Sequence, residues 1–119
     1  MIDTRIIVLI GTGNTMSKPV ALITGGGKRI GAAVSKKLME MGWYVLIHVN
    51  SSSKEARKII SDFSSNNGCE DCGDVLTCNL LIDSDVEKLI TSVIEHPAVI
   101  DAKGLSGLIH NASVYSSIE

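Results

Sequence analysis

A glycine-rich segment is the part of this sequence whose residue types and spacing most clearly suggest chemistry. It consists of Thr24-Gly25-Gly26-Gly27-Lys28-Arg29-Ile30-Gly31, and it lies between an aliphatic run and a helical pattern. Glycines let a phosphate approach the backbone closely, and the free N–H groups at a helix start attract negative charge. The segment therefore predicts a site for the pyrophosphate of a dinucleotide, and a plain glycine-rich turn is the alternative.

Two other interpretations of the glycines do not fit the spacing. A Walker A loop for a triphosphate has Gly-Lys followed by Ser or Thr, whereas Arg29 follows Lys28 here. An earlier glycine pair, in Gly11-Thr12-Gly13-Asn14, precedes Pro19 rather than a helical pattern. We therefore assign the dinucleotide to segment 24–31 and interpret the earlier glycines as part of a flexible leader.

The residues after the second aliphatic run indicate which dinucleotide to expect. An NAD-binding domain usually has Asp or Glu there, which accepts a hydrogen bond from the ribose. This sequence instead has Asn50-Ser51-Ser52-Ser53, whose hydroxyls can donate to a 2′-phosphate, and Lys28 and Arg29 add positive charge. The sequence therefore predicts NADP(H). An equally weighted interpretation, compatible with the first, is that the serines cap the next helix.

Four short aliphatic runs are the expected strands that position these residues. They occupy 20–24, 44–49, 75–78 and 105–110. Amphipathic helical patterns separate them, at 30–41, 52–63 and 84–94. This β-α-β-α-β-α-β alternation predicts an α/β fold, a truncated Rossmann-like doubly wound parallel sheet. Numbered along the chain, these four strands should lie in the order 3-2-1-4.

Residues 1–17 are ambiguous between an extra edge strand and a dispensable leader. We predict the leader, because no helix separates Ile10 from the strand at Val20 and Met16 could itself be a start. Residues 18–119 then form the N-terminal half of an NADP-binding Rossmann domain. The strand at 105–110 would lie at an open edge, so we expect self-association there or pairing with a missing C-terminal half.

Composition excludes several classes of protein. The chain has 119 residues, of which 45% are hydrophobic and 20% charged, so it has enough apolar material to bury a core. Lys plus Arg number 11 and Asp plus Glu 13, which leaves no basic footprint for nucleic acid. No apolar run approaches the ~18 residues of a membrane span. The odd number of cysteines, 3, argues against a secreted disulfide framework, so we expect a cytoplasmic location.

Other candidate ligands fit structural roles better. Cys69 and Cys72 form a C-x-x-C pattern, but zinc needs about four ligands and only Cys78 and distant histidines remain. We interpret the pair as exposed, incidental thiols and expect no metal site. His48 and His110 end aliphatic runs, where histidines more often pack or hydrogen-bond, and we place His48 beside the cofactor.

Together these motifs resemble the N-terminal half of short-chain dehydrogenase/reductases, most closely the pteridine reductase and dihydromonapterin reductase branch. The resemblance covers about residues 19–115 and depends on three anchors. They are segment 24–31, Asn79-Leu80 after the third strand, and His110-Asn111-Ala112-Ser113 after the fourth. Three anchors in this order, each at a strand end, are much more specific than any one of them.

The resemblance implies roles for individual residues. It places Arg29 near the cofactor phosphates and Asn79 where the family usually has an Asp facing the adenine amine. In the pteridine reductase branch, Ser113 lies by cofactor and substrate, and Tyr115 holds the position of an aromatic that stacks on the pterin. The expected cofactor-binding residues are Thr24, Gly25, Gly27, Lys28, Arg29, Ile30, Gly31, His48, Asn50, Ser51, Ser52, Asn79, Leu80, Asn111, Ala112 and Ser113.

The family's catalytic Ser, Tyr and Lys lie on later elements. Tyr44 and Tyr115 are the only tyrosines, and the residues four positions on are His48 and Glu119 rather than Lys. We therefore expect no catalytic residue in this chain and no activity from it alone. The leading hypothesis is the cofactor-binding half of an NADP(H)-dependent reductase of a carbonyl or pterin. The alternatives are a non-catalytic gene fragment or nucleotide-binding module, and one half of a split enzyme.

Overall fold

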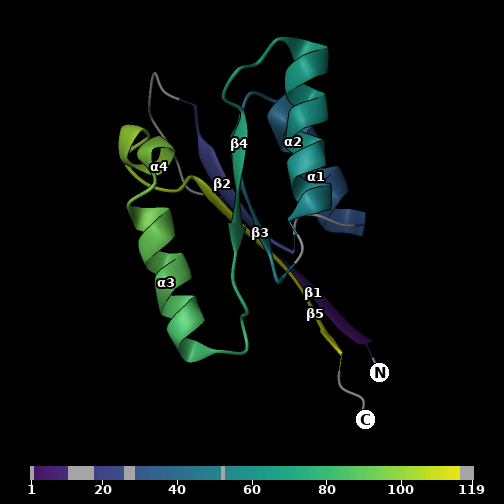
Figure 1. Ribbon diagram of the computed structural model, residues 1–119, viewed down its shortest axis with the longest axis vertical. Coiled ribbons are helices and arrows are strands. Elements are labelled where there is room, and N and C mark those ends of the chain that lie inside the picture. The colour runs from purple at the N-terminus through teal and green to yellow at the C-terminus, as the bar shows by residue number, and fades with distance from the viewer. Residues whose placement is uncertain (1, 11–17, 26–28, 52, 116–119) are drawn as a thin grey trace.

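The computed structural model describes residues 2–10, 18–25, 29–51 and 53–115, and of residues 2–10, 29 and 111–115 only the backbone. Its elements are, in chain order, β1 (Ile2–Ile10), β2 (Val20–Thr24), α1 (Arg29–Glu40), β3 (Tyr44–Val49), α2 (Lys54–Asn67), β4 (Gly73–Thr77), α3 (Asp83–Ile94), α4 (Pro97–Asp101) and β5 (Gly107–Tyr115). The strands form one sheet in the order β1-β5-β2-β3-β4, with α1 and α2 on one face and α3 and α4 on the other (Figure 1).

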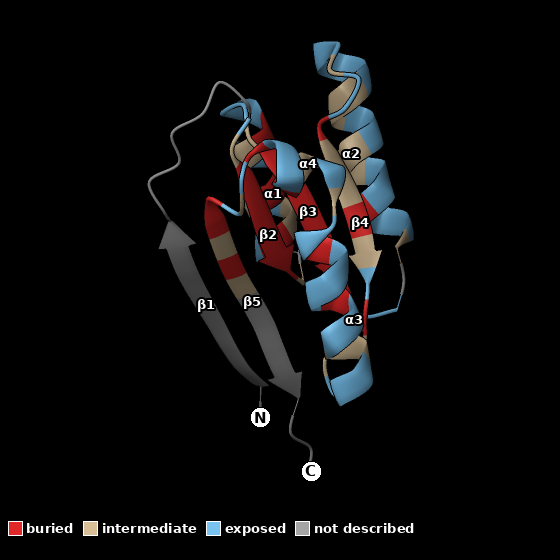
Figure 2. Ribbon diagram, turned by 90° about the vertical axis from the view of Figure 1, so that its left-hand side faces the viewer, coloured by how far each residue is buried: buried red, intermediate tan, exposed pale blue. Residues whose placement is uncertain are grey.

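The parallel part of this sheet confirms the predicted fold class. β5, β2, β3 and β4 are parallel neighbours, which is the expected order 3-2-1-4 read from the other end. Every residue of β2 and β3 is buried, because helices cover both faces of the central strands (Figure 2). Burial on both faces explains why these strands are continuous aliphatic runs rather than alternating ones.

Side chains alternate between two cores, one on each face of the sheet. Ile23 and Ile47 pack with Met39 of α1 and Ala56 of α2. On the opposite face, the cluster consists of Val20, Leu22, Tyr44, Leu46, Cys78, Leu89, Val93, Val99 and Ala102. Thr24 and His48 continue the alternation of Leu22 and Leu46, which places both on the α3 and α4 side at the ends of their strands.

The helices end close to the predicted positions, with two differences. α2 continues past the predicted pattern at 52–63 to Asn67 and is closed by Gly68 in a left-handed conformation, φ 66°. A short helix that was not predicted, α4, begins at Pro97, since proline suits the first helical position. In the described part of the chain, no helix is long and apolar enough to cross a membrane.

The prediction of a leader is wrong for residues 2–10. These residues form β1, which pairs antiparallel with β5 from Ile2 opposite Tyr115 to Ile10 opposite Gly107. The missing helix was misleading, because only parallel neighbours need a crossover and an antiparallel edge strand does not. Residues 1 and 11–17, with their glycines, lie outside the described residues. The β5 edge that we expected to be open is therefore paired with β1 within the chain.

Candidate cofactor site

Three side chains lie in a row across the carboxyl ends of the parallel strands. Thr24, the last residue of β2, is in register with His48 on β3 and with His110 on β5. Ligands of open α/β sheets bind outside these strand ends. The sheet thus brings together residues that are separated by 24 and 62 positions in the sequence.

His48 connects the first turn to two other strands. Its side chain is buried, with the residue 3% exposed. The backbone N–H of Gly25 donates to His48 Nδ1 at 3.2 Å, and His48 Nε2 lies 2.9 Å from the carbonyl oxygen of Cys78. Gly25 has φ 65°, the left-handed region that favours glycine, at the point where the chain leaves β2. His48 therefore joins the start of the glycine turn to the ends of β3 and β4.

These two contacts determine the protonation of His48. A backbone N–H only donates, so Nδ1 must hold a lone pair, and a carbonyl only accepts, so Nε2 must carry the proton. The ring is therefore neutral. Burial lowers the pKa of His48, the nearby His110 lowers it further, and the bond to the Cys78 carbonyl opposes both.

Thr24 and His110 form a second connection at the same edge. Thr24 Oγ1 and His110 Nδ1 lie 2.8 Å apart and hydrogen-bond, which ties the end of β2 to β5. Thr24 is buried and His110 is half-buried. The strand-end row is thus held by side chains as well as by the backbone ladder.

The helix start expected to face phosphate is only partly described. Arg29 is the first residue of α1, followed by Ile30, which is exposed, and Gly31. The Gly31 carbonyl accepts from Ser35 Oγ at 2.8 Å, which fixes the first turn of the helix. The predicted ligands Gly27 and Lys28 lie outside the described residues, as does the side chain of Arg29. The start of a helix attracts anions, and this one follows the end of β2 in the chain.

The residues expected to select the cofactor follow β3. Asn50 and Ser51 are exposed, and Ser52 lies outside the described residues. Ser53 is the N-cap of α2, yet its side chain makes no capping hydrogen bond; its Oγ instead accepts from Arg57 Nε at 3.3 Å. Arg57 is a cation that we did not predict here, although its spacing of four from Ser53 is a usable signal for contact on one helical turn.

The second anchor, which follows the third predicted strand, is built as a turn. Asn79 Oδ1 accepts from the Leu81 N–H at 3.0 Å, and the Asn79 N–H donates to Asp85 Oδ2 at 3.2 Å. The oxygen that we expected to accept from adenine therefore already has one partner, although an amide oxygen has two lone pairs. Leu80 is half-buried and packs against the core on the α3 and α4 face.

The third anchor lies in a strand rather than after one. Asn111, Ala112, Ser113 and Tyr115 belong to β5, which pairs with β1 beyond the point where β2 ends. We expected the strand to end at residue 110, and the correction has a simple cause: pairing with β1 keeps the chain extended. The positions of these four side chains lie outside the described residues.

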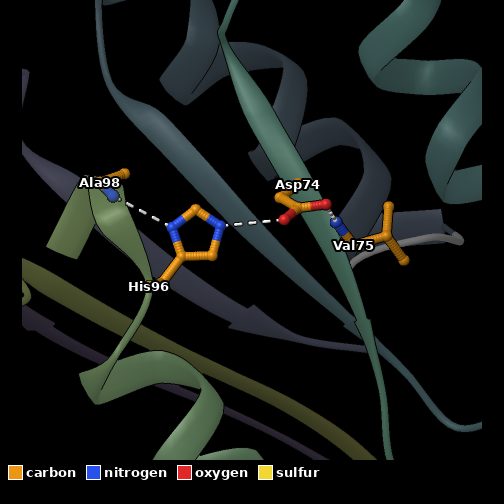
Figure 3. A network of polar contacts seen from close by, with 4 residues as sticks. All are labelled: Asp74, Val75, His96 and Ala98. Carbon is orange, nitrogen blue, oxygen red and sulfur yellow. Dashed lines mark hydrogen bonds and ion pairs between the residues drawn. The ribbon is translucent and has the colours of Figure 1, made fainter.

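A second polar cluster lies at the amino end of β4, away from the glycine turn (Figure 3). His96 Nε2 is 2.9 Å from Asp74 Oδ2, and His96 Nδ1 accepts from the Ala98 N–H at 3.1 Å. Asp74 Oδ1 accepts from the Val75 N–H at 2.8 Å. The cluster joins the start of α4 to β4, which is a structural role.

The two thiols of the C-x-x-C pattern are less exposed than we predicted. Cys72 is buried and Cys69 is half-buried, so the prediction of exposed thiols is wrong for Cys72; Cys78, at the end of the third predicted strand, is buried too. Burial raises the pKa of Cys72 to about 11. Lys18 Nζ lies 3.4 Å from Cys69 Sγ. Among the described residues, no three or more His, Cys, Asp or Glu side chains are grouped so as to hold a metal ion.

Comparison with known proteins identifies the family. Residues 19–119 match the short chain dehydrogenase family. The short chain dehydrogenase/reductase AacuN of Aspergillus aculeatus is 31% identical over 98 residues, which are 82% of this chain and 34% of that protein. The short-chain dehydrogenase/reductase homolog YusS of Bacillus subtilis is 28% identical over 101 residues, 85% of this chain and 84% of that protein.

A solved structure agrees with this match. FolM Alternative dihydrofolate reductase 1 from Brucella canis, complexed with NADP, superposes with a TM-score of 0.55 at 28% identity. The superposition covers 65% of this chain and 30% of that one. The chain thus spans about a third of the length of AacuN and FolM and most of the length of YusS. It belongs to the short-chain dehydrogenase/reductase family of oxidoreductases.

Proposed function

We propose that this chain is the cofactor-binding part of an NADP(H)-dependent short-chain oxidoreductase. The observation that carries the proposal is the end of β3, where Asn50 and Ser51 are exposed and no carboxylate follows before Glu55. A 2′-phosphate there would meet hydrogen-bond donors rather than a like charge. The FolM proteins of Brucella canis and Brucella suis were solved with NADP, which supports the same choice.

The residues of the chain fit such a cofactor in three ways. The left-handed Gly25 and the helix start at Arg29 suit the pyrophosphate, and Arg57 adds a cation at the start of α2. NADPH, when bound, supplies a hydride for reduction of the substrate. The role of this chain is to bind the cofactor, hold its phosphates and form one wall of the substrate site.

The proposed substrate is a carbonyl compound or a pterin. The resemblance of Ser113 and Tyr115 to pteridine reductase positions supports the pterin, as does the name dihydrofolate reductase carried by FolM. No Tyr-x-x-x-Lys pattern occurs in the 119 residues, so proton delivery to the product would need residues from outside them. We therefore expect the isolated chain to bind NADPH without reducing ketones, quinones or pterins at an enzymatic rate.

One observation favours a second candidate function, a small nucleotide-binding module. YusS matches this chain over 84% of its own length, so a relative of similar length occurs. The coding DNA downstream distinguishes the candidates. A continuation that encodes Tyr-x-x-x-Lys would support the reductase or a split enzyme, and unrelated DNA would support the module.

Calorimetric titration of the purified chain with NADPH and NADH tests the proposal. We expect tighter binding of NADPH, and we expect Asn50→Asp to weaken NADPH by about tenfold or more while affecting NADH less, because the new carboxylate repels the 2′-phosphate. Ser65→Asp is the matched control, since it adds the same charge at an exposed position near the other end of α2. Equal or tighter binding of NADH by the unmodified chain would contradict the proposal.

A further inference from the structure

We propose that His48 is a positioning residue that holds Gly25, where the glycine turn begins, in its left-handed conformation only while the His48 imidazole is neutral. The proposal rests on the proposed function, since the turn is taken to bind the dinucleotide phosphates. Through this buried side chain, pH would control the affinity of the chain for its cofactor. His48 does not touch the phosphates in this proposal; it acts through the backbone of Gly25.

The contact between His48 and Gly25 lies where the chain leaves β2. Gly25 is where the chain leaves β2 in a left-handed conformation, and its N–H points at His48 Nδ1 from 3.2 Å. On its other side the ring is anchored to the Cys78 carbonyl, 2.9 Å away, at the end of β4. A ring held at both nitrogens fixes the Gly25 amide relative to two strands.

A proton on Nδ1 changes this contact. The protonated ring carries N–H groups on both nitrogens, so Nδ1 would present a donor to the Gly25 donor. The Gly25 amide loses this acceptor, and the two N–H groups repel each other. His48 is only 3% exposed, so water has little access to replace the lost contact. Either Gly25 must then leave its position or the ring must leave the Cys78 carbonyl.

Polar groups from β2, β5, α3 and the end of β4 surround the His48 ring. His110 on β5 lies at the same edge and disfavours a positive charge on His48. Cys78, directly after β4, offers its carbonyl to the ring, while its thiol donates to the backbone oxygen of Asp85. The Asp85 carboxylate of α3 accepts from the Asn79 N–H. On β2, Thr24 is joined to His110.

Burial and His110 both favour the neutral ring, and they lower the pKa of His48. The neutral ring therefore predominates at pH 7.5 and gives way to the charged ring only below pH 6.5. An imidazolium could also attract phosphate directly, with the opposite effect on affinity. The geometry favours loss of affinity, since Nδ1 faces the Gly25 amide.

Nuclear magnetic resonance tests the contact without any cofactor. In the full chain we expect the imidazole nitrogen shifts of His48 to show the Nε2–H form at pH 7.5. The Gly25 amide resonance should move with the same midpoint as His48, below 6.5, and should lose that titration in His48→Gln. A Gly25 amide that does not respond when His48 titrates would overturn the proposal, even if His48→Gln fails to fold.

NADPH binding at pH 7.5 and 5.5 provides the functional measurement. Between pH 7.5 and pH 5.5, we expect the factor by which the dissociation constant for NADPH rises to be at least ten times larger for the unmodified chain than for His48→Gln. Any effect from titration of the 2′-phosphate of NADPH is the same for both proteins. His96→Gln, a histidine substitution at the opposite strand ends, should keep the unmodified profile. A profile shared by the unmodified chain and His48→Gln, or tighter binding at pH 5.5, would overturn the proposal. Absence of NADPH binding at every pH would instead refute the proposed function, while the Gly25 titration still decides this inference.

Discussion

Gly73, the first residue of β4, offers a sharp test of how the sheet is packed. A Cβ added there would lie 2.8 Å from the carbonyl oxygen of Val45 and 2.9 Å from Val45 Cγ2. It would also lie 3.2 Å from Ile60 Cδ1 of α2. Val45 is fully buried in β3, and its backbone is bonded to the Cys72 carbonyl, so it has little room to retreat. The substitution Gly73→Ala must therefore push β4 away from β3.

The expected cost is that of overpacking, about 1–3 kcal/mol, and the contact with a backbone atom favours the upper half of that range. For a domain of this size the loss corresponds to a fall in the melting temperature of about 5–15 °C. Differential scanning calorimetry or thermal unfolding followed by circular dichroism measures it directly.

Gly68 supplies the matched control for this experiment. A Cβ at Gly68 meets nothing within 4 Å, but its φ of 66° is strained for alanine. Gly68→Ala should cost about 1–2 kcal/mol, and Gly68→Asn should recover part of that loss because asparagine tolerates the left-handed region. If Gly73→Ala melts within about 2 °C of the unmodified chain, β4 does not approach Val45 as described and the steric reasoning fails.

Three further predictions concern pH, thiols and the sheet edge. The pKa of His48 is lowered in the folded state, so its contribution to stability is complete above pH 6.5 and is lost as the pH falls through the folded-state pKa. Urea unfolding at pH 7.5 and 5 should show this loss, and His48→Gln should reduce it; an equal slope in both would contradict the assignment. Cys69 should react with a thiol reagent before Cys72, because Cys72 is protected by burial. The number of thiols that react with and without urea checks this order, and an earlier reaction of Cys72 would contradict it. Deletion of residues 2–10 should open the edge of β5 and produce self-association in light scattering, whereas a monomer of unchanged stability would show that β1 does not protect that edge.

The parallel core could be predicted because its signal is local and strong. The runs 20–24 and 44–49 are aliphatic throughout, as strands buried on both faces must be, and glycines mark the ends of the helices between them. The prediction of a leader failed at residues 2–10 because an aliphatic run predicts a strand without naming its partner or direction. The helix α4 was missed because its five residues are too few to show a helical period.

The site was predicted less completely than the fold, for a related reason. Glycine spacing identified the turn at Gly25, but the partner of His48 had no sequence signal. Its two hydrogen-bonding groups are a backbone N–H 23 residues before it and a backbone carbonyl 30 residues after it. Any residue type offers those groups, so only the three-dimensional register of the strands could bring them to the imidazole.

The pairing of β1 with β5 has a consequence for assembly. In a doubly wound sheet, the position outside β5 is the one that the next parallel strand would take. Here nine residues of β1 already fill it, from Ile2 to Ile10. A strand arriving from a second polypeptide would therefore join by exchange rather than by simple addition. The rate of this exchange would be limited by how often β1 dissociates from β5. The amino-terminal strand would therefore control whether the sheet can be extended at this edge.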